Sequence, residues 1–166
     1  MAPFVSEALA GEHLLDDFHC GQPTLDSWLR ISAAHAGRMR TAKTFVWHAG
    51  DGKVVAYFSL AAHLVLREGL PKKLGRGSPD SIPAILLARL ALDQRLHGQG
   101  LGGELLWDAL TRAVHASELA AARVIVVDAV DESAALFYEH HGFVRVPGNE
   151  SRLVQKMGDV AAAVGR

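Results

Sequence analysis

Residues 85–103 of this chain read ILLARLALDQRLHGQGLGG. The apolar run up to Leu92 predicts a strand, and the glycines that follow open an amphipathic helical pattern near Leu101. The first turn of a helix carries unpaired N–H groups and the positive end of the helix dipole, and glycine lets an anion approach the backbone closely. The stretch therefore predicts a strand, a loop and a helix N-terminus that bind a phosphate group.

Three other interpretations of this stretch compete with that one. A P-loop ends in Gly-Lys-Ser or Gly-Lys-Thr, and the chain contains no such triplet. A dinucleotide loop has the pattern G-x-G-x-x-G in the first strand–helix unit of its fold, whereas these glycines have another spacing and follow at least two strand patterns. A glycine-rich turn without any ligand stays open at this point.

The composition is that of a globular protein. The chain has 166 residues, nearly half of them apolar, and a formal net charge of −1, so bulk charge does not indicate a nucleic-acid partner. One cysteine, Cys20, excludes an internal disulfide and suits a structural role in a reducing compartment. The N-terminus does not resemble a signal peptide, and no apolar stretch reaches the ~18 residues of a membrane span. We expect a cytoplasmic protein without membrane association.

Hydrophobic periodicity and turn residues predict the order of the elements. The first half is expected to hold a helix from a cap at Thr24 to near Gly37, a hairpin of strands 44–49 and 54–66, and an irregular connection over 67–83. A strand over 84–92, a helix over 101–117 and a strand over 123–129 should follow. The last elements are a helix that is capped by Asp131 or Ser133 and stops at Gly142, and a terminal hairpin of 143–146 and 153–157. This order predicts an α/β (α+β) sandwich on a mixed sheet. We expect one domain over 1–157 and a frayed tail over 158–166.

A second segment, residues 131–143, reads DESAALFYEHHGF. Its pattern Ala-x-x-Phe-Tyr-x-x-x-Gly-Phe, together with Arg-x-x-Gly-x-Gly from Arg95 to Gly100, resembles the GCN5-related N-acetyltransferases (GNAT). The resemblance implies a twisted, mostly antiparallel mixed sheet flanked by helices. It also implies a V-shaped splay between the strand before the glycine loop and the next strand, with acetyl-CoA as acyl donor.

The same resemblance implies roles for individual residues. The backbone of Leu90, Ala91 and Leu92 binds the pantetheine arm, and Tyr138 faces the thioester sulfur, where its phenol can protonate the leaving thiolate. The remaining cofactor-binding positions lie in the loop and at the start of the helix after it, namely Arg95, His97, Gly98, Gln99, Gly100, Leu101, Gly102 and Gly103. Two more, Ala134 and Phe137, lie in the segment 131–143. The structural alternative is that Tyr138 only packs beside Phe137.

The general base is not indicated by the sequence. Many family members carry a glutamate on the strand before the loop, but here no acid precedes Asp93 in that strand. Glu68, Asp93 and water are the remaining candidates. The α-amino group of an aminoacyl ester is more acidic than a lysine side chain, so such a substrate needs no strong base.

A narrower resemblance covers nearly the whole chain. The segments FHCG at 18–21, LDSWL at 25–29, RTAKTFV at 40–46 and IPAILLARLA at 82–91, with the Phe-Tyr segment, are similar to the acetyltransferase toxins of type II toxin–antitoxin systems. This resemblance implies acetylation of aminoacyl-tRNA and a block of translation. It also implies a ribbon-helix-helix antitoxin that binds operator DNA, and a homodimer. An acetyltransferase for a small amine or a protein N-terminus, and a non-catalytic acyl-CoA-binding module, stay as alternatives.

Candidate tRNA contacts and metal ligands follow from charged residues and histidines. Arg38, Arg40 and Lys43 lie within six residues, and Arg89 interrupts an apolar strand, where an unpaired charge is costly. We expect these four to contact the tRNA. On charge alone the favoured alternative is that they are ordinary solvated charges, with a buried salt bridge at Arg89. The adjacent His140 and His141 point to different helix faces, so we expect no metal.

Overall fold

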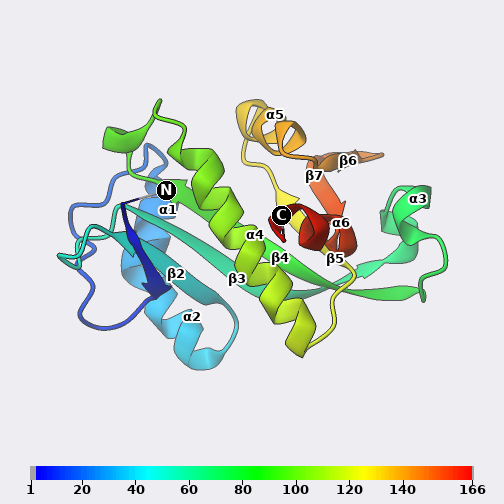
Figure 1. Ribbon diagram of the computed structural model, residues 1–166, viewed down its shortest axis with the longest axis horizontal. Coiled ribbons are helices and arrows are strands. Elements are labelled where there is room, and N and C mark those ends of the chain that lie inside the picture. The colour runs from blue at the N-terminus through cyan, green and yellow to red at the C-terminus, as the bar shows by residue number, and fades with distance from the viewer. Residues whose placement is uncertain (1–2, 166) are drawn as a thin grey trace. The chain divides into compact units, whose positions relative to one another are not determined.

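The computed structural model describes residues 3–165 (Figure 1). Its strands are β1 (Val5–Ala8), β2 (Lys43–His48), β3 (Ala56–Leu66), β4 (Ser81–Leu92), β5 (Val124–Asp128), β6 (Val144–Val146) and β7 (Asn149–Lys156). Its helices are α1 (Pro23–Ser27), α2 (Ala33–Met39), α3 (Lys72–Gly75), α4 (Leu101–Leu119), α5 (Glu132–His140) and α6 (Met157–Val164). A π-helical segment, Trp28–Ser32, joins α1 to α2, and 3₁₀ turns span Arg67–Gly69 and Gln94–Leu96.

The sheet is mixed and mostly antiparallel. Its seven strands follow the order β1-β2-β3-β4-β5-β7-β6. The pairs β1–β2, β2–β3, β5–β7 and β6–β7 are antiparallel, and β4–β5 is parallel. The parallel register runs from Ala84↔Val124 to Leu87↔Val127, while β4 itself continues to Leu92. This confirms the predicted fold class, whereas the splay between these two strands stays a prediction.

The chain packs into two compact units, and strands β3 and β4 pass through both. The first unit comprises the residues up to Ala61 together with Ala88–Ala109, and the second comprises Ala62–Leu87 with the residues from Leu110 onward. The prediction of one domain over 1–157 therefore stays a prediction. None of the helices in the described part of the chain is long and apolar enough to span a membrane.

The first unit is built around the α1–α2 helical stretch and the β2–β3 hairpin, and α2 contacts β2 (Figure 1). Its buried core consists of Phe18, Cys20, Leu29, Ala33, Val46, Val54, Tyr57 and Ala91. The helix was expected to start from a cap at Thr24, but its N-cap is Gln22 and Pro23 is the first helical residue. Proline suits this position because its φ is already helical and its missing N–H has no partner there.

The second unit has a core of its own, formed by Val65, Leu70, Ile82, Ala84, Val124, Val126, Val146 and Val154. Asp131 caps α5 through its side chain, which accepts a hydrogen bond from the Ala134 N–H. Helices α5 and α6 both contact β7.

The prediction of a frayed tail over 158–166 differs from the structure. Residues up to Val164 form α6, in which Met157 and Val160 are buried. These two side chains are three residues apart and thus share one helix face. The Met157 N–H also donates to the Arg123 carbonyl, 2.8 Å away. The sequence pattern missed this helix because the residues after Met157 are mostly small and apolar and show no clear helical period.

Candidate active site

The glycine loop begins at a buried carboxylate. Asp93 follows β4, is 1% exposed, and caps the 3₁₀ turn that starts the loop. Both of its oxygens accept hydrogen bonds from the Arg95 guanidinium, at 2.8 Å from Nε and 3.0 Å from the terminal nitrogen. The backbone N–H groups of Arg95 and His19 donate to it as well. Asp93 thus fixes the path of the chain into the loop, a role that the sequence analysis missed.

These contacts also bear on the chemistry of Asp93 and Arg95. Burial raises the pKa of Asp93, but the hydrogen bonds from Arg95 and His19 outweigh it, and the pKa is lowered. A carboxylate with a lowered pKa and all these partners is a weak base. Glu68, the other acid considered, is exposed in the second unit. The Arg95 side chain is bound to Asp93 and supports the loop by this contact.

The backbone geometry of the loop suits an anion-binding site. Gly98 and Gly100 both have φ of +78°, a left-handed conformation that suits glycine. A Cβ at either residue would have no atom within 4 Å, so open space faces both positions. Helix α4 starts directly afterwards at Leu101, and its first-turn N–H groups suit a phosphate. His97 Nε2 lies 2.8 Å from the Leu92 carbonyl and ties the loop to the end of β4.

Tyr138 lies on α5 in the second unit. Its ring packs against Phe137 at 5.3 Å and Phe143 at 5.6 Å between centroids, and the side chain is buried. Burial raises the pKa of the phenol to about 12. None of the described residues hydrogen-bonds to its hydroxyl, and burial is the sole cause of the raised pKa. The group is therefore a protonated phenol over the physiological range, which is the state that an acid requires.

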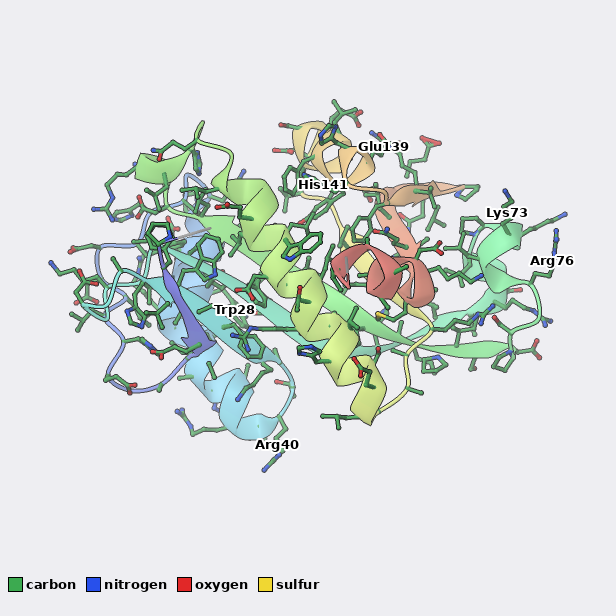
Figure 2. The ribbon with its side chains drawn as sticks, in the orientation of Figure 1. Trp28, Arg40, Lys73, Arg76, Glu139 and His141 are labelled. Atoms are coloured by element: carbon green, nitrogen blue, oxygen red, sulfur yellow. The ribbon has the colours of Figure 1, made fainter. Side chains whose placement is uncertain are left out.

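A salt bridge that the sequence did not indicate joins α5 to β6. Arg145 on β6 donates to both carboxylate oxygens of Glu132, at 3.0 and 2.8 Å, and to Glu139 at 3.0 Å. Both acids on α5 share the guanidinium of Arg145 on β6, but their carboxylates are exposed, so the contacts add little to stability. Burial and the neighbouring His140 lower the pKa of His141, which lies at the end of α5 (Figure 2). Its ring packs edge-on against Phe137.

The structure places the loop positions and Leu90–Leu92 in the first unit, and Ala134, Phe137 and Tyr138 in the second. The four tRNA candidates all belong to the first unit but do not form one group. Arg38 and Lys43 line a pocket of about 490 Å³, and Arg40 points outward at the end of α2 (Figure 2). Arg89 instead stacks on Trp28, with its guanidinium carbon 3.7 Å from the ring centroid.

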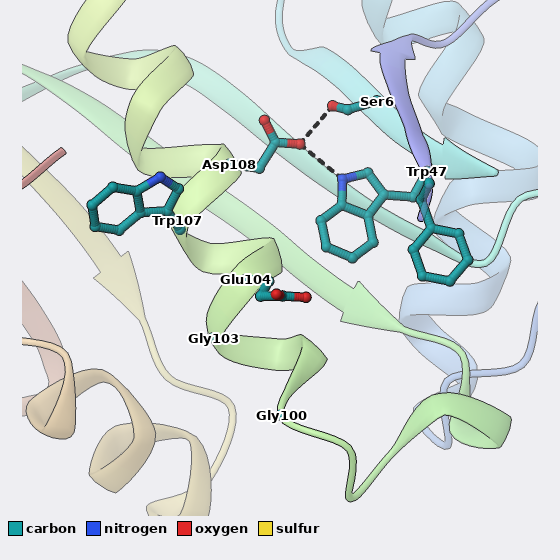
Figure 3. Close-up of a pocket in the computed structure, with 8 residues that line it drawn as sticks. Ser6, Trp47, Gly100, Gly103, Glu104, Trp107 and Asp108 are labelled. Atoms are coloured by element: carbon teal, nitrogen blue, oxygen red, sulfur yellow. Dashed lines mark hydrogen bonds between the residues drawn. The ribbon is translucent and has the colours of Figure 1, made fainter. Parts of the chain in front are cut away.

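A pocket of about 550 Å³ lies beside the start of α4 (Figure 3). Trp47 and Ser6 both donate hydrogen bonds to Asp108 on α4, and Gly100, Gly103, Glu104, Trp107 and Phe4 complete the wall. The sequence analysis missed this pocket because its residues come from three separate segments.

One cluster in the first unit has the composition of a metal site. The side chains of Glu7, His13 and His48 offer ligand atoms within 4.8 Å of one another. However, His13 Nδ1 accepts the Ala10 N–H at 2.9 Å, and His48 Nδ1 accepts the Gly50 N–H at 3.0 Å. Each neutral ring therefore carries its proton on Nε2 and donates it to Glu7, at 2.6 and 2.9 Å. The cluster is a hydrogen-bonded triad, and this geometry gives no reason to assign a metal to it.

Cys20 is buried in the first core, and burial raises the pKa of its thiol to about 11. A thiol in this state is unreactive at neutral pH, which agrees with the structural role expected for it.

Known proteins are similar to this chain in sequence and in fold. Residues 41–145 match the acetyltransferase (GNAT) domain. A tRNA-acetylating toxin of Mycobacterium tuberculosis is 37% identical over 148 residues, which are 89% of each chain. The structure of AtaT complexed with acetyl-methionyl-tRNAfMet superposes with a TM-score of 0.88 at 26% identity, over 96% of this chain and 98% of that one. The complex AtaTR bound with acetyl-CoA has a TM-score of 0.84 at 26% identity, over 96% and 97%. The chain belongs to the GNAT acetyltransferase family.

Proposed function

We propose that this protein transfers the acetyl group of acetyl-CoA to the α-amino group of an aminoacyl-tRNA, and that it acts as a toxin by blocking translation. The observation that carries the proposal is the likeness over nearly the whole chain to a tRNA-acetylating toxin and to AtaT with an acetylated aminoacyl-tRNA. The phosphate-binding geometry of the glycine loop and the protonated phenol of Tyr138 support it independently.

The donor is bound by the loop in this proposal. The pyrophosphate accepts hydrogen bonds from backbone N–H groups between His97 and Gly103, where left-handed glycines leave open space. The backbone of Leu90–Leu92, beyond the register that joins β4 to β5, binds the pantetheine arm. Ala134 and Phe137 complete the donor contacts from α5.

The transfer then requires two proton movements. The amine nitrogen forms the new bond to the acetyl carbonyl carbon, the carbon–sulfur bond breaks, and the thiolate takes the phenolic proton of Tyr138. The proton lost by the amine passes to water, because Asp93 is paired with Arg95 and Glu68 is exposed. A neutral α-amino group is well populated near pH 8, so transfer to an aminoacyl ester proceeds without a strong base.

The partners of the protein follow from the same proposal. AtaT has been captured with the C-terminus of the antitoxin AtaR, and the KacTA complex has been captured with DNA. We infer that this protein acts in the cytoplasm as a homodimer, and that a ribbon-helix-helix antitoxin neutralises it and links it to operator DNA. Arg38, Arg40, Lys43 and Arg89 are the basic residues that we assign to the tRNA.

The decisive experiment uses radiolabelled acetyl-CoA and a pool of charged tRNA. We expect the radiolabel to appear on the aminoacyl-tRNA. Mild alkaline hydrolysis should then release it as the N-acetyl amino acid. Uncharged tRNA, free amino acids and polyamines serve as the other acceptors. Label on a small amine alone, with none on charged tRNA, would assign the protein to another acetyltransferase class.

A further inference from the structure

Arg89 forms the outer layer of a three-part stack in the first unit. Its guanidinium lies over the indole of Trp28 at 3.7 Å, and Trp28 stacks on Tyr57 with centroids 6.1 Å apart and planes 11° from parallel. Tyr57 is fully buried, and its hydroxyl donates to the Leu25 carbonyl at 2.7 Å. Tyr57 is therefore fixed, and the Trp28 indole that stacks on it holds the Arg89 guanidinium in one plane.

The charge of Arg89 has no counter-ion in the described part of the chain. Its printed partner is the Trp28 ring, whereas Arg67, Arg95, Arg145 and Arg152 each pair with a carboxylate. Partial burial lowers the pKa of Arg89, yet a guanidinium stays charged in proteins. A half-buried cation without an anion is costly to keep. Because the indole covers one face of the guanidinium, its N–H donors remain available at the edge of the plane.

The position of Arg89 relates it to the acyl acceptor. It precedes Leu90–Leu92, the stretch that the proposed function assigns to the pantetheine arm, by one residue. Successive side chains of a strand point to opposite faces, so Arg89 shares its face with Ala91, which belongs to the first-unit core together with Tyr57. The Arg89 backbone is thus about 3–10 Å along the same strand from the residues assigned to the donor arm.

We propose that Arg89, held flat by Trp28, binds the 5′-phosphate of the terminal nucleotide that carries the amino acid. This inference rests on the proposed function and extends it to the recognition of the acceptor. That phosphate is the one closest to the esterified amine, and esterification leaves the amino acid no carboxylate of its own. A planar guanidinium with free edge donors suits a phosphate oxygen pair.

The test uses two small acceptors that differ only in this phosphate. These are adenosine with an amino acid esterified at its 3′-hydroxyl, and the same compound with a 5′-phosphate. The wild-type protein is expected to prefer the phosphorylated acceptor in kcat/KM by about 10–100-fold, the range of a hydrogen bond to a charged group. In Arg89→Gln the preference is expected to vanish, with acetyl-CoA affinity and melting temperature unchanged.

The matched control is Lys53→Gln, which removes one positive charge from an exposed side chain of the same unit. It should keep the phosphate preference. Charged tRNA provides a second measurement, the negative slope of log kcat/KM against log salt concentration. This slope should become shallower by about 0.7 in Arg89→Gln and keep its wild-type value in Lys53→Gln.

Two results would overturn the assignment. One is an Arg89→Gln protein that keeps the wild-type phosphate preference and salt slope. The other is an Arg89→Gln protein that acetylates both esterified acceptors as the wild-type protein does and loses only its transfer to free amino acids. That result would identify the anion bound by Arg89 as a carboxylate. Failure of the wild-type protein to acetylate charged tRNA would instead contradict the proposed function, so the two failures can be told apart.

Discussion

Tyr138 combines two features that are easily confused, a packed ring and a functional hydroxyl. The ring contacts Phe137 and Phe143, so a substitution that removes it would disturb α5 regardless of chemistry. The hydroxyl makes no hydrogen bond to a described residue, so its removal changes the packing very little. The pair Tyr138→Phe and Tyr138→Ala therefore separates the two roles.

We expect Tyr138→Phe to lower kcat by roughly 10²–10⁴-fold, the usual range for general acid–base catalysis, with little change in acetyl-CoA affinity or melting temperature. Expression of this variant should no longer inhibit growth. Because burial raises the pKa of the phenol to about 12, the wild-type kcat should not fall between pH 7 and 10 through loss of the phenolic proton. A folded Tyr138→Phe protein with full activity would return the residue to a packing role.

The glycine loop is the element on which donor binding depends. Gly100 has φ of +78°, and a β-branched residue there is strained even though space is available. Gly50, in the turn between β2 and β3, has φ of +103° and the same open surroundings. The two glycines are thus matched in backbone strain and differ in proximity to the proposed phosphate site.

Gly100→Val and Gly50→Val are both expected to destabilise the protein by about 1–3 kcal/mol. Only Gly100→Val should also weaken acetyl-CoA binding, by tenfold or more, because its side chain would occupy the space that we assign to the pyrophosphate. Calorimetric titration of the two folded variants measures this difference. Equal affinities in both would place the pyrophosphate elsewhere.

Helix α6 is the element that the sequence pattern missed. Val160 is 1% exposed and Ala162, two residues later, is exposed. Val160→Asp is expected to lower the free energy of unfolding by at least about 2 kcal/mol, because it buries a charge without a partner. Ala162→Asp should change it by less than about 0.5 kcal/mol. Urea denaturation of both variants is the measurement, and similar values would mean that α6 does not pack in solution.

At the scale of the whole molecule, the ion pair of the buried Asp93 with the largely exposed Arg95 predicts how stability depends on pH. The pKa of Asp93 is lowered in the folded protein, so the ionised carboxylate stabilises the fold. That contribution is complete above the unfolded pKa of about 4 and is lost as the pH falls through the lower folded value. Glu132 has a lowered pKa too, but its carboxylate is largely exposed and contributes little.

Asp93→Asn should therefore be about 1–3 kcal/mol less stable than the wild-type protein at pH 7, with the difference shrinking below pH 4. Glu132→Gln, which removes an exposed charge, should differ little at either pH. Unfolding free energies of the three proteins at several pH values test this. A constant difference for Asp93→Asn from pH 7 to pH 3 would contradict the assigned role of its charge.

Local patterns were sufficient to predict most of the fold. The β2–β3 hairpin follows from the glycines between two apolar runs, and the Asp131 cap and the glycine at 142 define the ends of α5. These features depend on residues only a few positions apart, so the chain itself specifies them. The sequence pattern did not predict helix α6, because the buried face of this helix has only two apolar side chains besides alanine. Its structure depends on packing against β7.

The sequence by itself determined the strand–glycine–helix junction, the Phe137–Tyr138 pair and the succession of strands β2 to β7 along the chain, but not the edge strand β1. Only the tertiary structure decided which side chain meets which across the chain. It pairs Arg95 with Asp93, places Arg89 on Trp28, and joins Trp47 to Asp108 across 61 positions. Backbone periodicity reports the face on which a residue lies, whereas a contact between distant residues depends on strand register and helix packing, which no local pattern encodes.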